Sequence, residues 1–131
     1  MIKVEHLKSG NILQFFIGEE GCEWEYTKID WQDIKWCQEK NANFNKFHKG
    51  IEITKDLLKQ TDFQLQSECF CFWQNSAWGI EKTTKGEWAI TYMGEFSGKF
   101  VKYFHQLQNF YFELSGSMLE LLPVAHHSIY R

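Results

Sequence analysis

Aromatic side chains are the feature that most constrains how this chain can fold. Trp, Tyr and Phe make up 18% of its 131 residues, with six Trp, five Tyr and twelve Phe. Each of them can bury roughly 150–250 Å² of surface, so even a chain of this length can build a substantial core. The hydrophobic fraction of 44% is that of a globular protein. We therefore expect one compact domain over residues 1–131.

Charge narrows the range of partners. The net charge is −3 and the isoelectric point is near 5.9, which disfavours binding to nucleic acid or to an anionic membrane. The single arginine is Arg131, the last residue. Because arginine usually makes the bidentate contacts to phosphate, its scarcity disfavours a nucleotide-binding or phosphoryl-transfer function. No apolar run approaches the roughly 20 residues that span a bilayer, and the N-terminus lacks the apolar segment of a secretory signal. We expect a cytoplasmic protein with reduced cysteines.

Hydrophobic spacing predicts an α+β fold, a mainly antiparallel sheet with about three helices packed on it. Residues 84–86 are expected to form the turn of a hairpin, and residues 8–11 the turn of another. A long run at residues 62–73 is expected to form a central strand. The expected strands cover residues 2–7, 12–17, 62–73, 77–83, 87–93 and 118–122.

The helices are predicted mainly from their end signals. Asp30 is expected to cap a helix that ends near Lys40, and Thr54 a short helix that carries Leu57 and Leu58. A third, amphipathic helix is expected after Ser97, with its apolar positions running from Phe100 to Leu114 and Gly116 at its end. Residues 41–45 are expected to form a loop.

No residue pattern indicates catalysis or metal binding, and we expect no cofactor and no enzymatic activity. Cys69 and Cys71 would lie on one face of a strand and could bind zinc together with His126 and His127, but the spacing is not that of common zinc sites. Two buried small side chains are the simpler interpretation. No catalytic signature accompanies the residues that could form a Cys/His pair, which include Cys22, Cys37, His48 and His105.

The sharpest signal is an acidic segment that contains aromatic residues. Between Glu19 and Asp33 there are six acidic residues and one lysine. Carboxylates steer a basic protein partner, and Trp and Tyr provide contact area in its interface. Glu23 and Glu25 share a strand face, but carboxylates this crowded usually form a solvated surface. The residues that we expect to bind a partner are Glu19, Glu20, Glu23, Trp24, Glu25, Tyr26, Asp30, Trp31 and Asp33.

The stretch GEEGCEWEYTKIDWQD, with the size and charge of the whole chain, resembles the immunity proteins of bacterial polymorphic-toxin and contact-dependent growth inhibition systems. Phage-encoded inhibitors of host defence share this character. The resemblance implies a non-enzymatic protein that neutralises a cognate toxin domain, often a basic nuclease, by covering its active site or an exosite.

Two other functions remain open. The first is a small-molecule-binding α+β domain with an aromatic pocket between sheet and helix. Its lining would be Trp73, Trp78, Trp88 and Tyr92. The second is a structural subunit of a larger assembly, which an extensive apolar surface would indicate.

Overall fold

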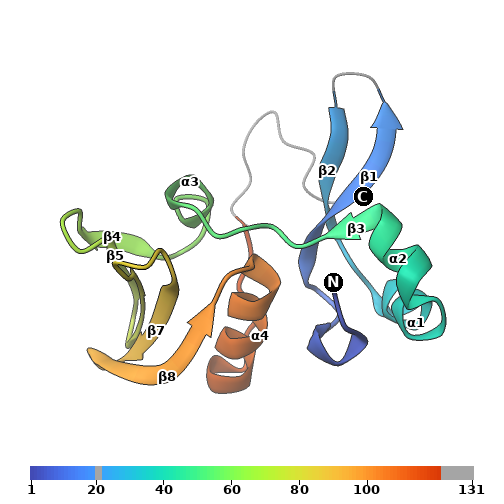
Figure 1. Ribbon diagram of the computed structural model, residues 1–131. Helices are drawn as coiled ribbons and strands as arrows, with labels where there is room; N and C mark the ends of the chain where they lie inside the picture. The colour runs from blue at the N-terminus through green and yellow to red at the C-terminus, as the bar shows by residue number, and fades with distance from the viewer. Residues whose placement is uncertain (20–21, 122–131) are drawn as a thin grey trace. The chain divides into compact units, whose positions relative to one another are not determined.

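A computed structural model describes residues 1–19 and 22–121 of the chain. The chain divides into two compact units. Unit 1 consists of Met1–Ile51 and Tyr103–Leu119, and unit 2 consists of Glu52–Lys102 with residues 120–121. Each unit combines an antiparallel sheet with at least one helix (Figure 1), so the chain has the α+β fold that its sequence predicts.

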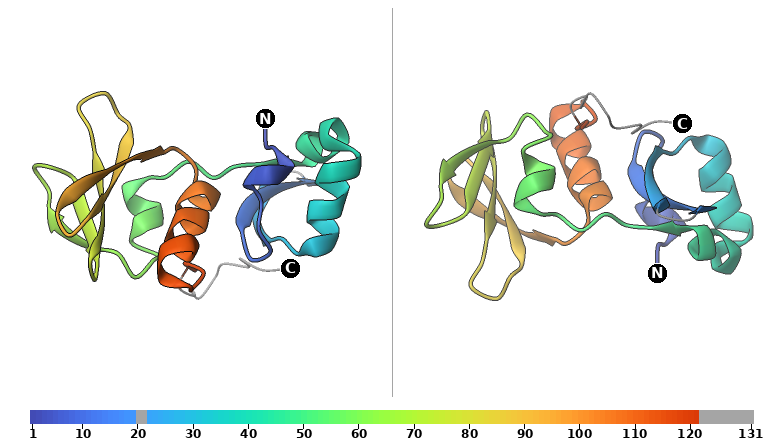
Figure 2. Two further views of the ribbon diagram at one scale, coloured as in Figure 1. Left: turned by 90° about the horizontal axis from the view of Figure 1, so that it is seen from below. Right: turned by 90° about the horizontal axis from the view of Figure 1, so that it is seen from above.

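Unit 1 is built on a three-stranded antiparallel sheet with the order β2-β1-β3. Figure 2 shows α1 and α2 on one side of this sheet and α4 on the other. The elements of the unit are a 3-10 helix η1 (Val4–His6), β1 (Ile12–Glu19), β2 (Cys22–Lys28), α1 (Trp31–Glu39), α2 (Asn41–Phe47), β3 (His48–Lys49) and α4 (Phe104–Ser115).

The core of unit 1 lies mainly between the sheet and the helices α1 and α2. Buried Leu13 on β1 belongs to one apolar cluster with Cys37 on α1 and Phe44 on α2. On the α4 side, the buried Gln108 side chain bonds backbone groups of β1 and of the segment that follows the helix. Its Oε1 accepts from the Ile12 amide at 2.8 Å, and its Nε2 donates to the Leu119 carbonyl at 2.8 Å. A polar side chain therefore attaches α4 to β1.

Two local predictions in unit 1 are wrong. Residues 2–7 form no strand but contain η1, because β1 pairs with β2 and β3 instead. Residues 41–45 are not a loop but the first part of α2. Asn41 Nδ2 donates to the Ile2 carbonyl at 2.9 Å, and Asn45 Oδ1 accepts from the Ile2 amide at 2.7 Å. These bonds to a distant segment stabilise a helix that asparagine alone does not favour.

Unit 2 is built on a five-stranded antiparallel sheet with strands in sequential order, β4-β5-β6-β7-β8. In both views of Figure 2 the short helix α3 lies against one face of it. The elements are α3 (Lys55–Leu58), β4 (Gln64–Ser67), β5 (Phe72–Asn75), β6 (Trp78–Lys82), β7 (Trp88–Tyr92) and β8 (Glu95–Val101).

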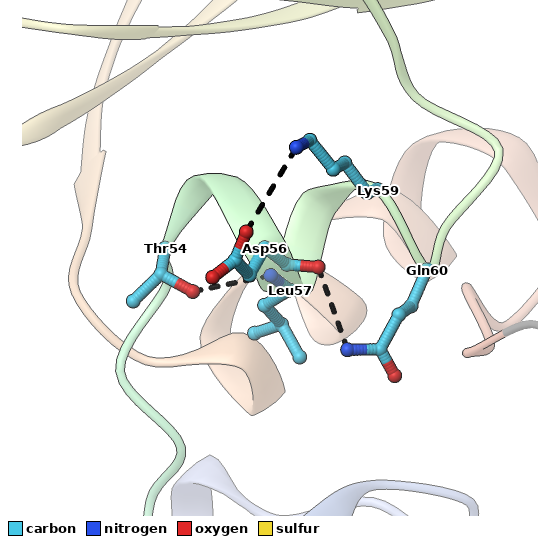
Figure 3. Close-up of polar contacts among 5 residues, drawn as sticks. All are labelled: Thr54, Asp56, Leu57, Lys59 and Gln60. Carbon is cyan, nitrogen blue, oxygen red and sulfur yellow. Dashed lines mark hydrogen bonds and ion pairs between the residues drawn. The ribbon is translucent and has the colours of Figure 1, made fainter. Parts of the chain in front are cut away.

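The helix α3 begins as predicted. Thr54 Oγ1 accepts a hydrogen bond from the Leu57 amide at 3.1 Å, and Gln60 Nε2 reaches back to the Asp56 carbonyl at 3.4 Å (Figure 3). Leu57 and Leu58 are buried. Capping thus fixes the start of a helix that is too short to be stable by itself.

One face of the five-stranded sheet forms the core of unit 2. Trp73, Ile80, Trp88 and Ile90 lie on it in register on three adjacent strands, and all four are buried. Trp88 Nε1 donates to the Ile53 carbonyl at 3.1 Å, just before α3. This arrangement confirms the hairpin predicted around residues 84–86, where Gly86 has a φ of +83°.

Three predictions in the second half of the chain are wrong. Residues 62–73 are not one strand, because a turn over residues 68–71 separates β4 from β5. The helix expected from Phe100 begins at Phe104, since residues 95–101 pair with β7 as β8. It ends as predicted at Gly116, which has a φ of +77°. No strand forms over residues 118–121, and residue 122 lies outside the described residues.

Within the described parts of the chain, no helix has both the length and the apolar composition needed to cross a membrane.

Candidate protein-binding surface

The acidic segment forms the second strand of the β1–β2 hairpin and the start of α1. In the hairpin, Trp24 pairs with Phe16 and Tyr26 with Gln14, whereas Glu25 pairs with Phe15. Paired residues share a face and neighbours along a strand alternate. The carboxylates of Glu23 and Glu25 and the rings of Trp24 and Tyr26 therefore lie on opposite faces of the sheet. Glu23 and Glu25 thus share a strand face, as the sequence predicts.

Trp24 is held by its neighbours and is only partly exposed. Its ring lies 5.2 Å from that of Phe16, and Lys49 Nζ lies 4.1 Å from its centroid. A cation this close to an indole face is attracted by the ring. Lys49 belongs to β3 and pairs with Gln14 across the sheet. Trp24 thus takes part in the packing of the sheet surface.

Tyr26 and Glu25 are also partly buried. Burial raises the pKa of the Tyr26 hydroxyl above its ordinary value. The face that carries Glu25 also carries Phe15, which lies 5.1 Å from the ring of buried His48. The side chains of Tyr26 and Glu25 are therefore less available to a partner than the sequence alone indicates.

Asp30 and Asp33 form a reciprocal cap at the start of α1. Asp30 Oδ1 accepts from the amides of Gln32 and Asp33, at 2.9 and 3.2 Å. Asp33 Oδ2 accepts in turn from the Asp30 amide at 3.0 Å. The predicted role of Asp30 as the N-cap is confirmed. Two of the six acidic residues therefore stabilise the helix, whatever else they bind.

Trp31 is the large exposed side chain of the segment. It is the first residue of α1, and 65% of its surface is exposed. The adjacent Asp30 is exposed too, and so is Glu23 at the other end of β2. Glu23 and Trp31 are separated by most of a strand, roughly 20 Å at about 3.3 Å per residue. The accessible part of the segment is therefore an extended surface with Trp31 at one end.

Glu19 and Glu20 are the remaining members of the predicted binding set. Glu19 is the last residue of β1. Glu20 lies outside the described residues.

The alternative chemistry is not assembled in the described part of the chain. Cys69 and Cys71 do not share a strand face, since they lie in the turn between β4 and β5, where Cys71 has a φ of +48°. His126 and His127 fall outside the described residues. No group of three His, Cys, Asp or Glu side chains within residues 1–19 and 22–121 is placed to hold a metal ion.

The histidines considered for catalysis are core residues. His48 is buried, stacks on Phe44 with ring centroids 3.8 Å apart, and its Nδ1 donates to the Phe44 carbonyl at 2.9 Å. His105 is buried beside Tyr103. Burial, with a smaller effect from His6, lowers the pKa of His105 to about 4, so its ring is neutral at pH 7.

The four residues predicted to line a small-molecule pocket do share one face of the five-stranded sheet. Trp73 and Trp88 are buried in the core of unit 2. Trp78 and Tyr92 pack on each other at one end of the face, with ring centroids 4.3 Å apart, and Tyr92 is exposed. The grouping follows from the hairpin, which the alternation of residues 87–93 predicts.

Lys49 and the exposed rings of Phe96 and Phe100 are surface features that the sequence did not predict. Lys49 reaches Trp24 only through the pairing of β1 with β3, for which the sequence has no local signal. The sequence predicts Phe100 on a helix face because it continues the spacing of the residues that follow. The glycines at positions 94 and 98 were the available signal, since they interrupt such a helix.

Comparison with known proteins finds no match to a protein-family profile, to a curated protein or to a solved structure.

Proposed function

We propose that the chain is a cytoplasmic, non-enzymatic inhibitor of the immunity-protein type, which binds a basic toxin domain and blocks it without turnover. The observation that carries the proposal is the exposure of Trp31 at the start of α1, beside an exposed carboxylate. Tryptophan is the residue type most enriched among the residues that dominate protein–protein binding energy.

Trp31 has the area to act as an anchor. A tryptophan buries up to about 250 Å². Two thirds of that area, at about 25 cal/mol per Å², corresponds to roughly 4 kcal/mol as an upper limit on the contribution of its burial in a complex. Large interface anchors lose about 2 kcal/mol or more on truncation. One such residue therefore supplies a substantial part of the affinity of a standard complex.

The charges around Trp31 favour a basic partner. Asp30 adjoins it, and Glu23 lies roughly 20 Å away along β2. Standard interfaces bury about 800 Å² on each partner, so one toxin domain is wide enough to contact both positions. Exposed carboxylates would mainly raise the rate of association, an effect that salt screens. Trp31 would mainly slow dissociation.

The test uses the product of the gene next to the one that encodes this chain, coexpressed and purified as an isolated domain. Trp31→Ala should weaken binding about 30-fold, corresponding to about 2 kcal/mol, mainly through faster dissociation. Glu23→Lys should slow association at low salt, and the effect should shrink at high salt.

The control variant is Phe112→Ala, which truncates an exposed aromatic side chain on α4. It should bind like the parent. If a folded Trp31→Ala variant binds and protects cells within twofold of the parent, the start of α1 is not the interface. If no product of a neighbouring gene binds the parent chain, the proposed function itself is wrong.

A further inference from the structure

The face of the five-stranded sheet opposite the core of unit 2 carries exposed aromatic rings. Phe96 and Phe100 on β8 are 55% and 50% exposed, and their ring centroids lie 5.0 Å apart. Pairing places Phe100 in one cross-strand row with Ala89, Glu81 and Phe72, and Phe96 in the next row with Thr91 and Gly79. We call these seven residues the aromatic face.

Small side chains separate the rings of the aromatic face. Gly79, Ala89 and Thr91 occupy its middle strands, with Phe72 on one side and the two β8 rings on the other. The Phe72 ring leans over Gly79, since a Cβ at that position would lie 2.6 Å from Phe72 Cε1. Thr91 Oγ1 is buried there and has no hydrogen-bond partner within the described residues.

Glu81 puts a negative charge in the middle of this apolar surface. It is partly exposed, and its direct neighbours in the row are Phe72 and Ala89. Within residues 1–19 and 22–121, no basic side chain forms an ion pair with it. Neighbouring strands are about 4.8 Å apart, so Phe100 lies roughly 10 Å from Glu81, with the small, buried Ala89 between them. An arginine or lysine side chain has the length to cross that interval.

We propose that the aromatic face binds a basic segment of a protein partner. An arginine or lysine of the partner places its cation at the Glu81 carboxylate and against the Phe72 ring, and its aliphatic stem crosses Ala89. Apolar side chains of the same segment pack on Phe96 and Phe100. A cation held between a carboxylate and an aromatic ring gains both an ion pair and a cation–π contact. Arginine is favoured, because its planar group also stacks on rings.

The Glu81 charge disfavours two other ligands of an exposed aromatic surface, a single-stranded nucleic acid and a second copy of the chain. A single-stranded nucleic acid stacks on exposed rings, but its phosphates would lie close to Glu81 without a compensating cation on the face. A second copy of the chain packed face to face would bring two Glu81 carboxylates together. The proposal concerns unit 2 alone and does not depend on the role of Trp31 in toxin binding.

The test uses a fluorescein-labelled peptide of alternating arginine and leucine as the probe and the full chain as the protein. Titration should shift the amide signals of the aromatic face in ¹H–¹⁵N spectra. Glu81→Gln and Phe100→Ala should each weaken binding at least fivefold at 150 mM salt. The matched control is Glu95→Gln, which removes the same charge from the opposite face of the same sheet. It should change binding less than twofold.

Three results would overturn the proposal. One is an equal loss of affinity in Glu81→Gln and Glu95→Gln, because it shows that only net charge matters. The second is binding of an oligo-dT 15-mer at least as tightly as the peptide. The third is a concentration-dependent dimer that Phe100→Ala abolishes. Circular dichroism and thermal melting show whether each variant is folded. If Phe100→Ala does not fold, Phe96→Ala takes its place, and if Glu81→Gln does not fold, Glu81→Asp takes its place.

Discussion

Replacing Gln108 by methionine tests how α4 is attached to β1. Gln108 is fully buried and makes three hydrogen bonds, all to backbone groups. It accepts from the Ile12 amide at 2.8 Å and donates to the carbonyls of Leu119 and Gly10, at 2.8 and 3.2 Å. Methionine has a similar length and volume, so Gln108→Met removes the bonds without creating a large cavity.

The expected cost follows from the groups left behind. A buried donor or acceptor that loses its partner costs about 1–3 kcal/mol. Two of the three bonds, those to Ile12 and Leu119, are buried, and the bond to Gly10 is partly buried. The free energy of unfolding should therefore fall by about 3–5 kcal/mol, a large fraction of the 5–15 kcal/mol typical of a domain. Apolar packing of the new side chain offsets part of this.

Urea unfolding followed by tryptophan fluorescence measures the effect. The control is Gln38→Met on the exposed side of α1, which should change the free energy of unfolding by less than about 0.5 kcal/mol. The slope with denaturant should not change if only native contacts are lost. A loss below about 1 kcal/mol in Gln108→Met, with an unchanged slope, would show that these bonds contribute little and that apolar contacts attach α4.

Two further perturbations address the cap and the buried histidine. Asp30→Ala removes the acceptor of the Gln32 and Asp33 amides and should lower the free energy of unfolding by about 1 kcal/mol. The control Asp62→Ala, at an exposed acid outside the helices, should leave the free energy of unfolding unchanged. Equal urea midpoints for the two variants would argue against a stabilising cap. The pKa of His105 is about 4 when folded and 6.5 when unfolded, so its contribution to stability is intact above pH 6.5 and is lost as the pH falls toward 4. Between pH 7.5 and pH 5 the parent should lose about 2 kcal/mol from this group, a loss that His105→Phe should remove, and parallel stability curves for the two proteins would contradict the assignment.

End signals of helices were predictable because they act within one turn of the chain. Asp30, Thr54 and Gly116 each bond or bend the backbone next to them, and all three end or begin a helix as predicted. The prediction failed where a distant segment decides the structure. Asn41 helps to form α2 only because its side chain bonds the backbone of Ile2.

The candidate surface was predictable in composition but not in geometry. Acidic and aromatic residues alternate over residues 23–26, and strict alternation in a strand is what puts them on opposite faces. The sequence cannot indicate that Lys49 covers Trp24, because that contact requires β3 to pair with β1. Exposure of Trp31 follows from its position on the outer side of α1, which depends on the core that α1 packs against.

The chain leaves unit 1 after Ile51 and returns to it at Tyr103, and the two crossings run side by side. The Ile53 amide bonds the Lys102 carbonyl at 3.0 Å, and the Phe104 amide bonds the Ile51 carbonyl at 2.8 Å. The two ends of residues 52–102 are thus about 5 Å apart, the spacing of paired strands. A segment whose ends meet in this way has the connectivity of an insertion. It can be exchanged for another, or shortened, without stretching the polypeptide that remains, so variation in this half of the gene need not disturb the other half.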